Sequence, residues 1–197
     1  TTAEGEGEGE GEVFEFTVNG QVQRTEEDKP LLRYLRDDLK LYSVKDGCSE
    51  GACGTCTIVV DGKAIKSCVL TTKRAVGRNI LTVEGLSDEW KDAFVYAFGA
   101  VGAVQCGFCI PGMVMAGTAL LQNNLNPTEE DVKYALRGNI CRCTGYKKII
   151  EGILLTAKIL RGEASVDEDL EKGDLYGVGQ KAFRVDVRKK VLGFGKY

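Results

Sequence analysis

The sequence predicts an α+β fold in which a β-rich part is followed by an all-helical part. Residues 13–86 contain short alternating runs joined by Asn-Gly and Asp-Gly turns, a pattern typical of β-hairpins. Residues 87–161 contain four apolar segments with helical spacing and helix start signals. Each part also holds four of the eight cysteines in the 197-residue chain. Each part is therefore expected to be built around its own metal site.

The β-rich part begins with a predicted hairpin. Residues 13–18 alternate apolar and polar side chains and run into an Asn-Gly turn, which predicts a strand followed by a second short strand. Pro30 begins a helix with leucines along one side. Three further strands are expected, at residues 57–60, 63–65 and 80–84.

The helical part is predicted from its start signals. Ser87 can cap the first helix, and Pro111 lies near the first turn of the second. Thr128 and Asp131 have the spacing of a capping box for the third. The fourth helix is expected in the sequence KKIIEGILLTAKILRG. Four short helices with short connections predict a four-helix bundle.

The two ends of the chain differ from this pattern. Residues 1–12 alternate glycine and glutamate, have no apolar face to bury, and are predicted to form a disordered leader. The whole chain has a formal net charge of −3, but residues 13–197 alone are near neutral, because the leader carries much of the negative charge. A near-neutral body argues against nucleic-acid binding. Residues 162–197 are polar and punctuated by glycine, which predicts an extended C-terminal arm. The sequence shows neither an apolar run of membrane-spanning length nor a signal-peptide pattern.

The cysteines indicate the chemistry, because the chain has no histidine. Without histidine, Ser-His-Asp hydrolysis, His-ligated zinc catalysis, Rieske clusters and His-ligated haem are excluded. The cysteine spacings are C-x4-C-x2-C-x11-C and C-x2-C-x31-C-x-C. Four disulfides are the alternative, but the sequence has no secretion signal and C-x-C suits paired bonds poorly. Two tetrathiolate metal sites are therefore expected.

The first set has the plant-type [2Fe–2S] spacing, whereas zinc ribbons usually pair two C-x2-C knuckles. The set consists of Cys48, Cys53, Cys56 and Cys68. An oxidised cluster on four thiolates carries a net charge of about −2 and needs backbone N–H groups directed at its sulfurs. Gly47, Gly51 and Gly54 let the loop wrap closely around such an anion.

The second set could hold either zinc or a cluster by its spacing alone. It consists of Cys106, Cys109, Cys141 and Cys143. Each of its pairs is followed by helical sequence, so the free N–H groups and dipole of a helix N-terminus would favour an anionic site. Because structural zinc tolerates the same setting, the residues favour iron–sulfur but leave zinc open.

Three stretches together resemble a known family. GCSEGACGTCTIVVDG, QCGFCIPGM and CRCTGY, in this order and spacing, are similar to the iron–sulfur subunit of molybdenum hydroxylases of the xanthine dehydrogenase and aldehyde oxidase family. The resemblance covers roughly residues 13–161 and includes all eight ligand positions. It implies a plant-ferredoxin-like β-grasp domain with one [2Fe–2S] cluster on the first set. It also implies an all-α four-helix-bundle domain with another cluster on the second set.

The resemblance also implies partners and a direction of electron flow. Molybdopterin would belong to a large molybdenum-binding subunit and FAD to a medium subunit, so no residue of this chain would be catalytic. Electrons would pass from molybdenum through the helical-domain cluster and then the ferredoxin-like cluster towards FAD or another acceptor. Gln105 and Cys143 match residues that approach the pterin. Arg142 could raise the potential of its cluster or simply be solvated, and Glu50 is expected at the surface.

Several alternatives remain beside this interpretation. A free-standing two-cluster ferredoxin-type carrier is a second functional class, and a zinc-stabilised adaptor is a third. The end of the arm, from Gly177 to Tyr197, resembles the entry into the molybdenum-binding portion of single-chain relatives. It would either dock on the molybdenum subunit or mark a chain cut from a longer product. Thiolate clusters favour a cytoplasmic location, with export through a partner's signal as the alternative.

Overall fold

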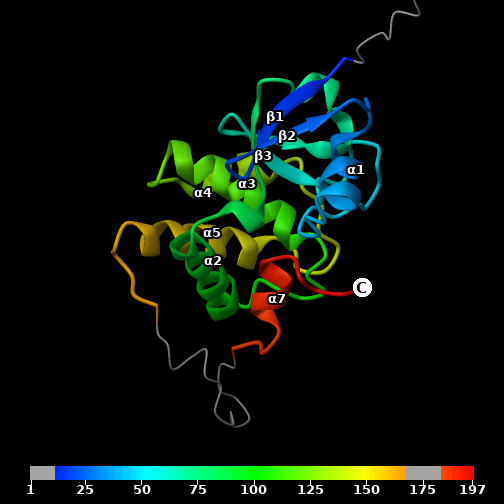
Figure 1. Cartoon of the computed structure of the whole chain (residues 1–197). Coiled ribbons are helices and arrows are strands. Elements are labelled where there is room, and N and C mark those ends of the chain that lie inside the picture. Colours follow the sequence, from blue (N-terminus) through cyan, green and yellow to red (C-terminus); the bar gives the residue numbers. More distant parts are fainter. Residues whose placement is uncertain (1–11, 167–182) are drawn as a thin grey trace, which may run out of the picture.

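The computed structural model describes residues 12–166 and 183–197 (Figure 1). Nearly all of the predicted leader and part of the predicted arm, including Gly177, lie outside the described residues. Strands come first and helices second along the chain, so the predicted α+β class is confirmed. In the described ranges no helix has the length and apolar character that crossing a membrane requires.

A five-stranded mixed sheet forms the first part, in the order β2-β1-β5-β3-β4. Its strands are β1 (Phe14–Val18), β2 (Gln21–Thr25), β3 (Thr57–Val60), β4 (Lys63–Lys66) and β5 (Asn79–Leu81). β1 and β2 form one antiparallel hairpin and β3 and β4 another, as the two turns predicted. β5 joins the hairpins, parallel to β1 and antiparallel to β3.

The predicted strand over residues 80–84 is shorter in the structure. β5 ends at Leu81, and a 3₁₀ turn follows at Val83–Gly85. The reason is local, because the Thr82 N–H donates to the side-chain oxygen of Asn19 at 2.9 Å and not to a neighbouring strand. The Asn19 side chain thus takes the N–H that could have continued the strand pairing, and β5 ends there.

The helix after Pro30 packs on one face of the sheet. It consists of α1 (Leu31–Arg33) continued by a π-helical turn over Tyr34–Asp38. Its leucines and the inward residues of the strands form a buried cluster that includes Phe16, Leu31, Leu35, Ile58 and Ile80. The inward-facing side chains of the alternating strands and the apolar side of the helix therefore form one core.

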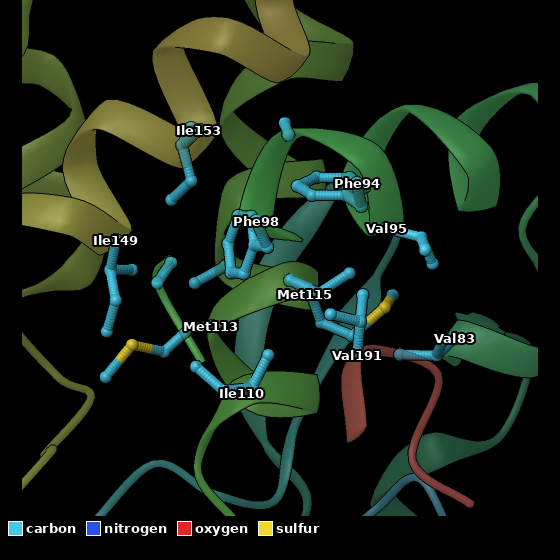
Figure 2. Packing of buried hydrophobic residues seen from close by; sticks show 14 of the residues in the cluster. Val83, Phe94, Val95, Phe98, Ile110, Met113, Met115, Ile149, Ile153 and Val191 are labelled. Atoms are coloured by element: carbon cyan, nitrogen blue, oxygen red, sulfur yellow. The ribbon is translucent and has the colours of Figure 1, made fainter. Parts of the chain in front are cut away.

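Four helices form the second part: α2 (Asp88–Val101), α3 (Ile110–Asn123), α4 (Glu129–Leu136) and α5 (Lys147–Leu160). The start signals act as predicted, with Ser87 capping α2 and a complete Thr128–Asp131 capping box at α4. Figure 2 shows their shared core, where Phe94 and Phe98 of α2 lie near Ile149 and Ile153 of α5. A Cβ on Gly152 would lie 2.8 Å from the Phe98 ring, so this glycine permits the close α2–α5 packing.

The predicted extended arm contains a short helix instead, α7 (Val187–Val191). α7 packs against α2 and α3, and Val191 belongs to the same buried cluster as Met115 (Figure 2). Val187 and Val191 are four residues apart and lie on one buried face. Five helical residues are too few to show a period in the sequence, which explains the wrong expectation for this segment.

Candidate iron–sulfur sites

The first cysteine loop leads into β3 and folds back on itself. Ser49, Gly51 and Gly54 all have positive φ, at 53°, 74° and 74°. This curvature directs backbone N–H groups at sulfur. Both Glu50 N–H and Cys53 N–H donate to Cys48 Sγ at 3.4 Å. Gly51 N–H donates to Cys68 Sγ at 3.2 Å. The loop therefore provides the donors that an anionic cluster requires.

The four thiols of the first set come from this loop, from the start of β3 and from the turn after β4, and they interact most strongly in two pairs. Cys48 interacts with Cys53, and Cys56 interacts with Cys68. The N–H donors of Cys53 and Glu50 lower the pKa of Cys48 to about 7. Burial and the nearby Cys56 raise the pKa of Cys68 to about 11. Thiolate formation is thus easier at Cys48 than at Cys68.

The second set is also arranged in pairs. Cys109 interacts with Cys141, and Cys143 interacts with Cys106. Cys109 is the N-cap of α3, as the helix start signal predicted, and burial raises the pKa of its thiol. Burial also acts to raise the pKa of Cys141. Hydrogen bonds to its sulfur outweigh burial, among them one from the Thr144 hydroxyl at 3.1 Å, so the pKa of Cys141 is lowered.

This pairing fits a [2Fe–2S] cluster in each set. All eight cysteines are free thiols in the structure, which agrees with metal sites rather than the disulfide alternative. A structural zinc ion gathers four ligands around one point, whereas each iron of a [2Fe–2S] cluster takes two protein ligands. In the part of the chain that the structure describes, no three His, Cys, Asp or Glu side chains surround one ion position. Within each set the thiols also influence one another across these pairs, so all four lie close enough to serve one site.

The two cysteine loops contact each other directly. Ile140 N–H donates to the Cys53 carbonyl at 2.8 Å, which joins the residue before Cys141 to a ligand of the first set. Beside it, the buried Asn139 amide donates to the Gly54 carbonyl at 2.9 Å and to the Thr57 hydroxyl at 3.2 Å. The contact fixes one loop against the other.

Tyr146 supports the same contact from the helical side. Its hydroxyl accepts from Cys141 N–H at 2.9 Å and donates to the Asn139 carbonyl at 3.3 Å. Its backbone has φ 71°, a conformation that a residue with a bulky side chain rarely adopts. Sequence reasoning missed Asn139 and Tyr146, because nothing in their spacing signals a contact between loops that are far apart in the sequence.

The remaining predicted site residues lie at the surface. Gln105, Cys106 and Cys143 are exposed, and so are Glu50 and Arg142. By contrast, Cys56 and Cys109 are buried. The second set therefore has thiols at the surface, whereas the thiols of the first set are buried or half-buried beneath the exposed Glu50.

Replacing Asn139 with alanine is expected to lower the free energy of unfolding by about 1–3 kcal/mol, because it removes two buried hydrogen bonds that each contribute about 0.5–1.5 kcal/mol. Thermal unfolding of the cluster-loaded protein measures the loss. Asn126→Ala is the matched control, since Asn126 is exposed. Equal unfolding temperatures for the two variants would show that the Asn139 contact contributes nothing.

Comparison with known proteins agrees with this geometry. Residues 16–80 match the family described as 2Fe-2S iron-sulfur cluster binding domain, and residues 82–154 match the family described as [2Fe-2S] binding domain. The chain is 44% identical over 135 residues to the nicotinate dehydrogenase small FeS subunit of Eubacterium barkeri, covering 67% of this chain and 86% of that subunit. It is 43% identical over 145 residues to the xanthine dehydrogenase iron-sulfur-binding subunit of Escherichia coli O157:H7, covering 71% and 91%.

A solved structure shows the same fold in a longer chain. The aldehyde oxidoreductase of Desulfovibrio desulfuricans has a TM-score of 0.82 and 35% identity. The match covers 94% of this chain but only 21% of that enzyme. The described fold thus corresponds to about a fifth of the longer protein.

The fold and the paired cysteine loops define a two-cluster iron–sulfur protein of the electron-transferring class. The chain belongs to the iron–sulfur subunits of the molybdenum hydroxylases, in the xanthine dehydrogenase and aldehyde oxidase family. Its function is electron transfer within an oxidoreductase whose catalytic site lies on a partner chain.

Proposed function

We propose that this chain conducts electrons through two [2Fe–2S] clusters whose ligand loops are joined directly by hydrogen bonds. The proposed ligands are Cys48, Cys53, Cys56 and Cys68 for the first cluster, and Cys106, Cys109, Cys141 and Cys143 for the second. When bound, each cluster takes up and releases one electron at a time. The hydrogen bond from Ile140 N–H to the Cys53 carbonyl carries the proposal, because it joins the two loops without an intervening element.

The chain's own residues hold the clusters and control their exposure. Backbone N–H groups of the first loop stabilise thiolate charge on Cys48 and Cys68, and the Thr144 hydroxyl does so on Cys141. Buried Cys56 and Cys109 keep part of each site away from water. The exposed ends provide one place for electrons to enter and another for them to leave.

The exposed end of the second set is the proposed entry. Gln105 and Cys143 are proposed to approach the pterin of a molybdenum-binding large subunit. Support comes from their exposure and from the pairing of Cys143 with Cys106, which places a proposed ligand at the surface. Arg142 is exposed beside them, which supports the solvated alternative for its side chain.

The exposed end of the first set is the proposed exit. Ser49, Glu50 and Ala52 are exposed between the first two ligands of that loop. A medium subunit with FAD, or another acceptor, would dock there and receive the electrons. The location proposed for the assembled complex is the cytoplasm, because reducing conditions preserve thiolate ligands.

The proposed domain limits follow the two cores. Residues 13–86 would form the ferredoxin-like β-grasp domain and residues 87–161 the four-helix-bundle domain. Residues 1–12 and 162–197 would be the leader and the arm. The two buried clusters support the division between the first two domains, although Val59, Val83 and Leu86 also pack in the helical cluster. Val187 and Val191 of α7 belong to the helical cluster as well, so this part of the arm packs on the second domain.

Purification of the native complex through a tag on this chain tests the assembly. A larger polypeptide containing molybdopterin is expected to co-purify, together with a polypeptide containing FAD. Substrate added to that complex without an electron acceptor should bleach the visible absorption of the clusters. Recovery of this chain alone, with both clusters, would instead support the free-standing carrier.

A further inference from the structure

The segment 183–197 lies against the loop that carries two proposed ligands of the second cluster. Lys190 Nζ donates to the Gln105 carbonyl at 3.0 Å, and the Tyr197 hydroxyl donates to the Cys106 carbonyl at 3.1 Å. The Tyr197 ring also meets Phe108 edge to face, with centroids 5.2 Å apart. Residues far apart in the sequence thus hold two consecutive carbonyls of the cysteine loop.

The fit between this segment and the loop is close. Gly107 has φ 89°, and a Cβ there would lie 2.7–2.8 Å from side-chain carbons of Lys190. The Lys190 ammonium is itself held by Asp186 at 2.9 Å. At the start of the segment, the Phe183 ring stacks on Tyr96 of α2. The aliphatic stem and the charged end of Lys190 are therefore both placed by the fold.

The same segment is anchored to the first domain. The Lys45 ammonium donates to the Gly193 carbonyl at 2.9 Å and lies 5.4 Å from the centre of the Tyr197 ring. Lys45 is only 6% exposed, so these two partners replace much of its lost water. The Lys45 carbonyl in turn accepts from Thr55 Oγ1, which contacts Cys53 Sγ at 3.3 Å. The segment thus connects both cysteine loops.

We propose that residues 183–197 form a clamp on the second-cluster loop, in which Lys190 and Tyr197 are positioning residues for Cys106. This inference rests on the proposed function, because it takes Cys106 as a cluster ligand. The clamp acts through the backbone of the loop, because the hydrogen bonds from Lys190 and Tyr197 end on the Gln105 and Cys106 carbonyls and not on the Cys106 sulfur. Its expected role is to keep the exposed Cys106 thiolate in place and so to preserve the second cluster.

Two variants of the cluster-loaded protein of residues 1–197 test the clamp. Tyr197→Phe removes the hydroxyl but keeps the ring against Phe108, and Lys190→Met removes the ammonium but keeps the stem against Gly107. The controls are Tyr134→Phe and Lys189→Met, which make the same chemical changes at exposed side chains. The measurements are iron release to a chelator and the electron paramagnetic resonance spectrum of the dithionite-reduced protein.

Each clamp variant is expected to release iron from the second cluster about two- to tenfold faster, the factor that corresponds to one hydrogen bond. The resonance of the second cluster should shift or broaden, while that of the first stays unchanged. Unchanged release and spectra would overturn the clamp. Parallel changes at both clusters with a lower unfolding temperature would also overturn it, since they indicate general destabilisation. A wild-type protein without a second [2Fe–2S] signal would instead overturn the proposed function itself.

Discussion

Replacing Cys109 with alanine is expected to leave one [2Fe–2S] cluster in each chain, so that iron falls from about four atoms to about two. Cys109 is buried beside Cys141 at the start of α3, so replacing it removes a proposed ligand from the interior of the second site. The first loop keeps all of its sulfur donors. Iron and acid-labile sulfide analysis gives the cluster number, and resonance of the reduced protein shows which signal is lost.

The reciprocal variant provides the control. Cys56 is buried and belongs to the first set, so Cys56→Ala should also leave about two iron atoms but remove the other signal. Electron transfer from substrate to acceptor through the complex should stop in both variants. If both variants lost the same signal, the division of the eight cysteines into these two sets would be wrong.

The second large effect is expected from Gly54→Ala, at the contact between the two cysteine loops. Gly54 has φ 74°, and a Cβ there would lie 2.2 Å from the Gly138 carbonyl oxygen and 3.0 Å from Asn139 Cα. Both neighbours are backbone atoms that cannot turn away. Left-handed strain and the clash together are expected to cost about 3–5 kcal/mol. The measurement is the unfolding temperature of the cluster-loaded protein, with the iron content of the purified variant.

Gly62→Ala is the matched control for this variant. Gly62 has nearly the same backbone angle, φ 77°, but nothing lies within 4 Å of the position of its Cβ. Gly62→Ala should therefore lower the free energy of unfolding only by the cost of the left-handed backbone strain, about 1–2 kcal/mol. A Gly54 variant no less stable than the Gly62 variant would mean that the two loops are not pressed together as the structure has them.

The strands and helices could be predicted well because their signals are local. The turns at Asn19-Gly20 and Asp61-Gly62, the Ser87 cap and the Thr128–Asp131 capping box all depend on neighbouring residues, and each is present. Two predictions failed where a distant residue decides the structure. The Asn19 side chain ends β5 early, and burial against α2 and α3 makes a helix of Val187–Val191.

The candidate sites divide in the same way. Cysteine spacing identified the two sets, because C-x4-C-x2-C, C-x2-C and C-x-C are short motifs that can be recognised locally. The residues that support them were not found. Asn139 and Lys45 donate to carbonyls of other loops, and Tyr146 donates to the carbonyl of Asn139. A carbonyl is present in every residue, so the sequence carries no mark of which ones are used.

Metal and sulfide analysis of the purified chain, together with resonance of its reduced form, tests the central claim most directly. Two [2Fe–2S] clusters predict about four irons and about four acid-labile sulfides per chain, with two distinct paramagnetic signals after reduction. Two zinc ions without sulfide, or iron and sulfide in half these amounts with a single signal, would contradict the two-cluster account.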